Sequence, residues 1–196
     1  ASAALLALPV AANAQIAVET TNFITAPTQF NGFEAIASDP NYHSRGNAFR
    51  GGATYTEDGI SVSYVGGDNS SNEIFVGYLR EGRYGWYNNG GGVGYTRITR
   101  ADGSDFSAVQ FLAGSGFGSA GYGLQYNLLN NGVSVATGVA GTVGHPLRYY
   151  GFSGGGFDEI WLQNNLEGAF RVGSYEALAL DSIALGGSNG VPEPAA

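Results

Sequence analysis

Apolar and polar residues alternate with a period of two along much of this chain, which is the pattern of strands that bury one face. In Tyr122–Leu128 the even positions are apolar and the odd positions are glycine, glutamine and asparagine. Asn130-Asn131-Gly132 follows, and Asn and Gly tolerate the positive φ values of a tight hairpin turn. Val133–Val139 continues the alternation. The pattern therefore predicts an antiparallel β-hairpin.

The same signals recur through the rest of the chain. Thr54–Thr56 and Ile60–Tyr64 flank the turn Glu57-Asp58-Gly59 and predict a second hairpin. Ile74–Tyr78 also alternates, and Arg83–Tyr87, which follows the turn residues Glu81-Gly82, is expected to pair with it. Further strands are expected at Gln15–Asn22, Tyr95–Arg100, Ser107–Ala113, Leu147–Phe152, Phe157–Leu162, Ala169–Val172 and Ala177–Leu185. No convincing helical stripe interrupts them, so residues 15–185 are predicted to form one all-β domain, an antiparallel β-sandwich.

The last of these strands changes phase in its middle. Leu178 and Leu180 share one parity, whereas Ile183 and Leu185 share the other. A β-bulge inserts one extra residue and re-aims the side chains that follow it. The sequence therefore predicts a bulge at Asp181-Ser182.

The composition of the chain excludes several classes of function. The chain of 196 residues has 33 Gly, no Cys and no Lys, and its formal net charge is −8. An acidic chain without lysine is a poor match for nucleic acid, whose phosphates attract clustered basic charge. The absence of Cys removes disulfides, thiol catalysis and Cys-ligated metals, and the absence of Lys removes Schiff-base chemistry.

The N-terminal residues 1–14 have the features of a signal peptide. An apolar run from Leu5 to Val10 is too short for the ~20 residues of a membrane-spanning helix. Ala12-Asn13-Ala14 then supplies the small residues that signal peptidase requires. We expect residues 1–14 to be the remnant of a signal peptide that is cut between Ala14 and Gln15, so the chain is predicted to be exported. A hydrophobic N-terminal helix is the alternative.

The C-terminal residues 186–196 consist of a Gly/Ser/Asn spacer followed by Val191-Pro192-Glu193-Pro194. This end resembles the PEP-CTERM proteins, which are exported proteins of Gram-negative bacteria. In that family an exosortase recognises V-P-E-P, a membrane helix and a basic tail. The chain ends before a helix or tail. The resemblance implies an exosortase partner and a place at the cell surface or in the exopolysaccharide matrix.

The second half also resembles an extracellular domain common in that family, a sandwich of jelly-roll type. The resemblance is carried by Asp105–Phe111, Tyr126–Val135, Gly156–Leu162 and Ala179–Leu185. It implies a jelly-roll architecture, and it leaves the molecular activity open.

Two catalytic motifs match by spacing alone. Gly151–Gly155 fits the G-x-S-x-G nucleophile elbow around Ser153, but that motif requires a following helix and a later histidine. A strand follows here, and both His43 and His145 precede the serine. Gly116–Gly121 fits G-x-G-x-x-G, but the strand that follows and the lack of a nearby acid exclude a dinucleotide site. We therefore predict a non-catalytic protein.

One metal site is predicted. The jelly-roll carbohydrate-binding modules, which these positions resemble, often hold a structural calcium between a first-strand Glu and a last-strand Asp. Glu19 and Asp181 occupy similar places here, and carboxylates with backbone carbonyls suit calcium. The alternative for Asp181 is an edge residue hydrogen-bonded to a turn.

One ligand site is considered. Tyr84, Trp86, Asn88 and Asn89 combine aromatic rings with amide groups, so they could contact a sugar. Core packing is the favoured alternative for the two rings, because Trp and Tyr bury large apolar areas. The predicted function is a structural or adhesive matrix protein that contacts extracellular polysaccharide. The alternatives are a carbohydrate-binding module with calcium and, least favoured, a glycan or ester hydrolase.

Overall fold

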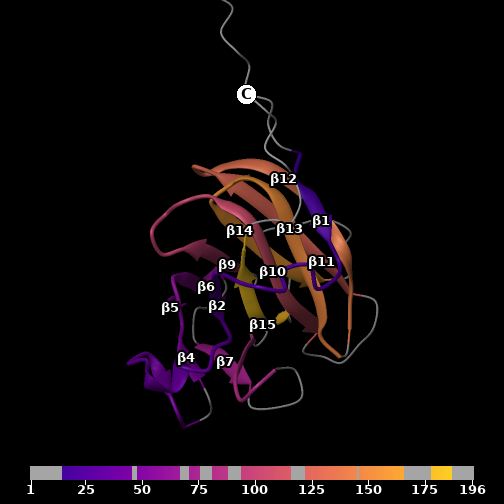
Figure 1. Cartoon of the computed structure of the whole chain (residues 1–196). Helices are drawn as coiled ribbons and strands as arrows, with labels where there is room; N and C mark the ends of the chain where they lie inside the picture. Colours follow the sequence, from indigo (N-terminus) through magenta and orange to yellow (C-terminus); the bar gives the residue numbers. More distant parts are fainter. Residues whose placement is uncertain are drawn as a thin grey trace, which may run out of the picture.

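The computed structural model describes residues 15–45, 48–66, 71–75, 81–87, 94–115, 122–144, 146–165 and 178–186. Almost all of the regular structure is β, and the two antiparallel sheets pack against each other (Figure 1). This confirms the predicted antiparallel β-sandwich. The finer jelly-roll topology stays a prediction.

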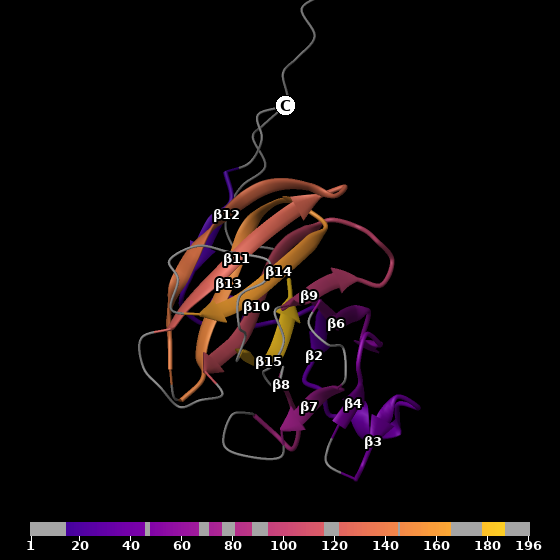
Figure 2. The ribbon, with the colours of Figure 1, turned by 180° about the vertical axis from the view of Figure 1, so that it is seen from behind.

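One sheet has six strands in the order β12-β11-β14-β9-β6-β5. Their bounds are Thr54–Glu57 (β5), Ile60–Gly66 (β6), Gly94–Arg100 (β9), Tyr122–Asn130 (β11), Val133–Val143 (β12) and Glu159–Asn165 (β14). The strands β11 and β12 run side by side, and β12 forms the margin of the sheet (Figure 2).

The other sheet has nine strands, with the order β1-β13-β10-β15-β8-β7-β4-β3 and with β2 also paired to β15. Their bounds are Ala17–Glu19 (β1), Gln29–Asn31 (β2), Tyr42–His43 (β3), Ala48–Arg50 (β4), Ser71–Phe75 (β7), Gly85–Tyr87 (β8), Phe106–Ser115 (β10), Arg148–Phe157 (β13) and Leu178–Leu185 (β15). A 3₁₀ turn at Ile36–Ser38 lies between β2 and β3.

The two strongest hairpin predictions are confirmed. Asn131 and Gly132 have φ values of 50° and 78° between β11 and β12, and Asp58 and Gly59 have 44° and 76° between β5 and β6. Positive φ at both central residues fits the tight turns whose twist matches that of the flanking strands. The β7–β8 pairing also joins the two segments that were expected to pair around Glu81-Gly82.

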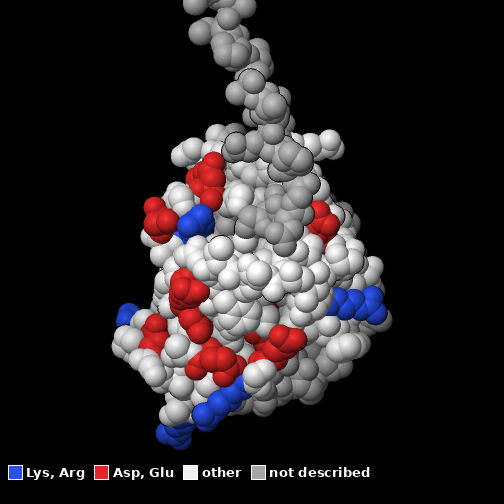
Figure 3. All heavy atoms as spheres, viewed as in Figure 1, with Lys and Arg blue, Asp and Glu red and all other residues white. Residues whose placement is uncertain are grey.

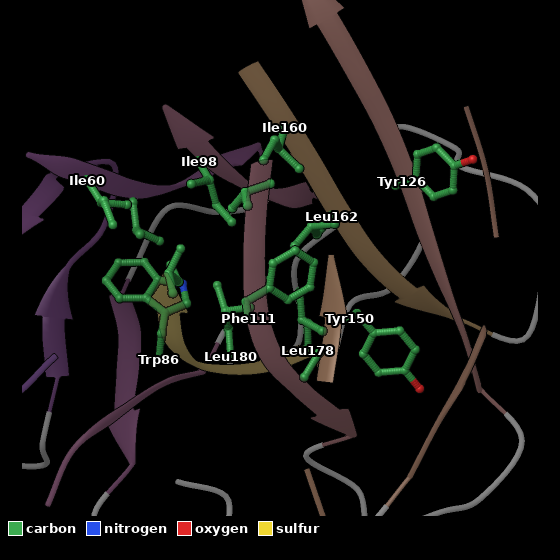
Figure 4. Packing of buried hydrophobic residues seen from close by; sticks show 14 of the residues in the cluster. Ile60, Trp86, Ile98, Phe111, Tyr126, Tyr150, Ile160, Leu162, Leu178 and Leu180 are labelled. Atoms are coloured by element: carbon green, nitrogen blue, oxygen red, sulfur yellow. The ribbon is translucent and has the colours of Figure 1, made fainter. Parts of the chain in front are cut away.

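The core lies between the two sheets, where the apolar residues of the alternating segments meet (Figure 4). Ile98 and Ile160 come from the six-stranded sheet, and Phe111 and Leu180 come from the nine-stranded sheet. Trp86 is fully buried, with Phe33 stacked on it at a centroid distance of 5.9 Å. The period-two pattern therefore places these side chains on the inner faces.

The predicted bulge at Asp181-Ser182 is confirmed. Along β10 the register moves from Gln110 to Leu112, while along β15 it moves from Ala184 to Asp181, so β15 carries one extra residue. Ser182 has a φ of 50°. On the side of β15 that faces away from β10, the bulge separates two partner strands. Residues 179–180 pair with β8, and residues 183–185 pair with β2.

The N-terminal strand is shorter than predicted. Of the expected Gln15–Asn22, only Ala17–Glu19 pairs with β13. The chain then leaves the sheet edge and packs Phe23 and Ile24 over Ala108 and Ala184. The Gln110 side chain fixes this segment, because its Oε1 accepts hydrogen bonds from the backbone N–H groups of Phe23 (2.6 Å) and Ile24 (2.9 Å).

Candidate functional site

The two predicted calcium ligands do not meet. Glu19 lies in β1 and Asp181 lies in β15, and β13 and β10 separate these strands in the sheet. Three inter-strand steps of about 4.8 Å place the two backbones roughly 14 Å apart. The first and last strands are therefore not neighbours in the sheet. Among the described residues, no group of three or more potential metal ligands gathers.

Each carboxylate has a local partner instead. The Glu19 carboxylate accepts a hydrogen bond of 3.0 Å from the Ser153 hydroxyl. The fully buried Asp181 carboxylate accepts hydrogen bonds from the backbone N–H groups of Glu81 (2.5 Å) and Ser182 (2.6 Å). Asp181 therefore joins the bulge to the turn that precedes β8, which agrees with its alternative interpretation as an acceptor for a turn.

This turn is held by further acidic residues. The Glu34 carboxylate accepts hydrogen bonds from the N–H groups of Arg83 (2.6 Å) and Tyr84 (3.1 Å), and Glu81 accepts one from the Ser182 hydroxyl (3.0 Å). Burial raises the pKa of Asp181 to about 7, and the nearby Glu81 and Glu34 charges add to this rise. Backbone N–H donation from Glu81 and Ser182 acts in the opposite direction. Because these acidic groups accept bonds from the protein itself, they fix the position of the turn.

The two aromatic residues of the predicted ligand site lie in the core. Trp86 is fully buried, and Tyr84 is 4% exposed and contacts Tyr42 edge-on. Neither ring offers a face to a ligand, which argues against a sugar site here and agrees with the favoured core alternative. Asn88 and Asn89 lie outside the described residues, as do Ala14, His145 and the motif Val191–Pro194.

The second tryptophan, Trp161, lies on the face of the six-stranded sheet that points away from the core. Asn127 of β11, Trp161 of β14 and Arg97 of β9 stand in one row across three adjacent strands. Tyr95 of β9 and Glu159 of β14 complete the group, which we call the Trp161 patch. The period-two alternation explains the placement, because Ile160 and Leu162 point into the core and their neighbours point outward.

The Trp161 patch is held by direct contacts. The Tyr95 and Trp161 rings stack with a centroid distance of 4.3 Å and an interplanar angle of 25°. Arg97 forms an ion pair with Glu159, with Nε–Oε1 and Nη2–Oε2 distances of 2.6 and 3.0 Å. The Trp161 indole N–H donates to the same carboxylate. Burial raises the pKa of the Tyr95 phenol, and the Glu159 charge adds to this effect.

This arrangement has the chemistry of a sugar-binding surface. Small-molecule sites combine aromatic surface with a few fixed polar groups. Trp161 is half-buried, the Arg97 side chain is 43% exposed, and Asn127 stands beside Trp161 on the next strand. The Arg97–Glu159 pair is neutral overall, which suits an uncharged glycan better than an ionic ligand.

A groove lies elsewhere, beside the lead-in to β1 and the start of β12. Its volume is about 770 Å³, and its described lining residues are Gln15, Ile16, Asn130, Val135, Ala136 and Gly154–Gly156. None of these described residues has an ionisable side chain. The groove therefore offers amide, backbone and apolar contacts.

Ser153 of the rejected nucleophile motif and the adjacent carboxylates of Asp158 and Glu159 each have a structural partner. Ser153 lies within β13, where it is paired in register with Ala17 and Ala108. Asp158 accepts a hydrogen bond of 3.0 Å from the Asn131 N–H in the β11–β12 turn, while Glu159 pairs with Arg97. These neighbouring carboxylates therefore have separate partners.

Comparison of the chain with protein-family models, curated proteins and solved structures finds no match to any of them. Within the described part of the chain, no helix is long and apolar enough to span a membrane.

Proposed function

We propose that this chain is an exported, non-catalytic protein of the cell surface or exopolysaccharide matrix of a Gram-negative bacterium. Its role is structural and adhesive, through weak and repeated contacts with extracellular polysaccharide. Signal peptidase cuts it between Ala14 and Gln15, and an exosortase reads the signal that begins at Val191–Pro194. The sequence of the two chain ends supports the location.

The observation that supports polysaccharide contact is the Trp161 patch on the outer face of the six-stranded sheet, where Trp161 is half-buried and the Arg97 side chain is 43% exposed. The Trp161 ring, stacked on the more deeply buried Tyr95, offers apolar surface to the C–H face of a sugar. The Arg97–Glu159 pair and Asn127 lie beside the ring and offer hydrogen bonds to sugar hydroxyls. Because Glu159 already holds both Arg97 and the Trp161 N–H, little ordering is needed when a sugar binds.

A second candidate function is a carbohydrate-binding module for one defined oligosaccharide. The fixed geometry of Arg97, Glu159 and Trp161 favours this alternative, because a preorganised site gives specificity as well as affinity. A jelly-roll fold and a structural calcium belong to the same proposal, although the predicted ligands Glu19 and Asp181 lie on strands that are not neighbours. The two functions differ in whether binding saturates on one short glycan.

The test is a binding screen on extracellular polysaccharides and their oligosaccharides, with the Trp161→Ala variant beside the wild type. Binding to long polysaccharide that falls at least tenfold in the variant supports the adhesive function; tenfold corresponds to about 1.4 kcal/mol. Saturable binding to one oligosaccharide supports the module. Release of sugar or acid from any glycan or ester would support a hydrolase and contradict both.

The matched control is Phe30→Ala, which removes an exposed aromatic ring (43% exposed) from β2 on the other sheet. This control should bind like the wild type. Because Trp161 is half-buried, Arg97→Gln is a second variant that leaves both rings in place. If Trp161→Ala and Arg97→Gln keep the far-UV circular dichroism and cooperative unfolding of the wild type and bind as well as the wild type, the patch is not the binding site.

A further inference from the structure

One edge of the six-stranded sheet is formed by β12, a strand without charged residues. β12 is the terminal strand, and among the described residues only β11 pairs with it. It has eleven residues, about twice the usual strand length of ~5–6. Three of the five exposed large hydrophobic residues of the described chain lie on it, namely Val133, Val135 and Val139. A long edge of this kind readily pairs with another strand.

The exposed side chains of β12 are arranged symmetrically. Val135, Thr137 and Val139 are exposed and alternate with the less exposed Ala136 and Gly138. In an antiparallel pair of identical strands with a two-fold axis at Thr137, Thr137 faces itself and Val135 faces Val139 of the second copy. Cross-strand pairs of β-branched residues stabilise antiparallel sheets. The strand is therefore complementary to itself in one register, as a two-fold interface requires.

The bulges of β12 limit the length of this pairing. The register with β11 gives β12 one extra residue at Val135 and another at Ala140. Bulges on an edge strand reduce its ability to pair. Between them, Ala136–Val139 is regular and includes the proposed axis at Thr137, so Thr137 pairs with itself there and Val139 of each copy meets the bulged Val135 of the other. The contact is therefore short, and the resulting dimer dissociates on dilution.

The distribution of charge bears on which partner strand can pair with the β12 edge. The chain carries a net charge of −8, and acidic side chains outnumber basic ones on the face in Figure 3. Two copies with the same net charge of −8 repel each other, but Val133–Val143 contains no charged residue. A second copy can therefore meet β12 without placing like charges in the contact.

We propose that β12 is a self-association edge, at which two copies of this chain pair antiparallel about a two-fold axis at Thr137 and join their six-stranded sheets. This inference does not depend on the proposed function. Because the net charges repel, association should increase with ionic strength, since salt shortens the range of the repulsion to about 8 Å at 0.15 M.

The test is disulfide trapping of the full chain, which has no natural cysteine. Residues directly opposite in an antiparallel pair have Cα atoms about 4.5–5.5 Å apart, within the range that a disulfide spans. Thr137→Cys should therefore form a covalent dimer under mild diamide oxidation. The matched control is Val133→Cys on the same strand. In this register position 133 faces Gly141 of the second copy, about 26 Å from the other introduced cysteine at ~3.3 Å per residue.

Sedimentation of the wild type supplies an independent readout. The wild type should shift toward dimer with rising protein and salt concentration, and Thr137→Lys should stay monomeric because two lysines would meet at the axis. Thr54→Lys, on the opposite edge strand β5, should behave like the wild type. The proposal is overturned if the Thr137→Cys and Val133→Cys variants cross-link at equal rates, or if the wild type and Thr137→Lys sediment alike at every concentration.

Discussion

The buried Asp181 carboxylate makes the stability of the fold depend on pH. Its pKa is raised to about 7 in the folded protein, whereas the ordinary value for an aspartate is 3.8. The folded state therefore binds a proton more tightly than the unfolded state. This stabilisation is fully present below pH 3.8 and is lost as the pH rises through 7.

The size of the effect follows from this difference. A pKa difference of about 3 corresponds to about 4 kcal/mol between the two extremes of pH. Between pH 8 and pH 5 the gain in the free energy of unfolding is about 2–3 kcal/mol by the same relation. At ~2–4 °C per kcal/mol, the melting temperature should rise by about 5–10 °C. Asp102, whose pKa is lowered by hydrogen bonds from Ser104, acts only below pH 3.8 and does not mask the change.

The assay is urea unfolding followed by tryptophan fluorescence at intervals from pH 5 to pH 8. Trp86 is fully buried, so its emission reports loss of the core. Asp181→Asn should remove most of the pH dependence, because an amide does not titrate in this range. Its absolute stability is expected to fall, since the new NH₂ group can face the Glu81 N–H that donates to the carboxylate in the wild type.

The control is Asp102→Asn, which changes an exposed carboxylate and should keep the wild-type slope. A flat wild-type profile from pH 5 to pH 8 would refute the reasoning. So would an equal slope in the wild type and in Asp181→Asn. Either result would mean that hydrogen bonds from Glu81 and Ser182 outweigh the cost of burying the charge.

Two further predictions concern the N-terminal segment. Gln110→Leu should lower the melting temperature by several degrees, because it leaves the N–H groups of Phe23 and Ile24 without their acceptor. Each unsatisfied N–H group costs about 1–3 kcal/mol of stability. Thermal melts measure the change, and the control is Gln29→Leu, whose side chain forms its hydrogen bond at an exposed site. Glu19→Gln should leave any response to calcium unchanged, since Glu19 bonds to Ser153 and two strands separate it from β15. Melting curves in chelator and in millimolar calcium measure it, and a calcium-dependent shift that Glu19→Gln removes would contradict the strand order.

Local features of the fold were predictable from the sequence because they depend on neighbouring residues. Asn131-Gly132 and Asp58-Gly59 adopt the positive φ values that their chemistry favours. The bulge at Asp181-Ser182 was visible as a change of apolar parity within one strand. In each case the signal and the structure lie within a few residues of each other.

The candidate site was less predictable, because it depends on which strands become neighbours. Strand order is a long-range property, so similarity of position alone placed Glu19 beside Asp181. Trp86 and Trp161 both lie in alternating segments, and which ring is buried depends on which face of its strand meets the other sheet. The useful signal for Trp161 was its parity, shared with Glu159 and opposite to Ile160 and Leu162.

The place of β15 in the sheet has a consequence for how the chain acquires its structure during synthesis. This strand is the last in sequence among the described elements, yet it lies between β10 on one side and β8 and β2 on the other. Residues 29–31 and 85–87 therefore cannot complete their strand pairing until residues 178–185 have been synthesised. Such long-range pairing slows folding, because the entropy cost of closing a long loop comes before the stabilising contacts between the strands can form. A nascent chain that ends before Leu185 lacks a complete central sheet, so folding is expected to finish only after nearly the whole domain has been made.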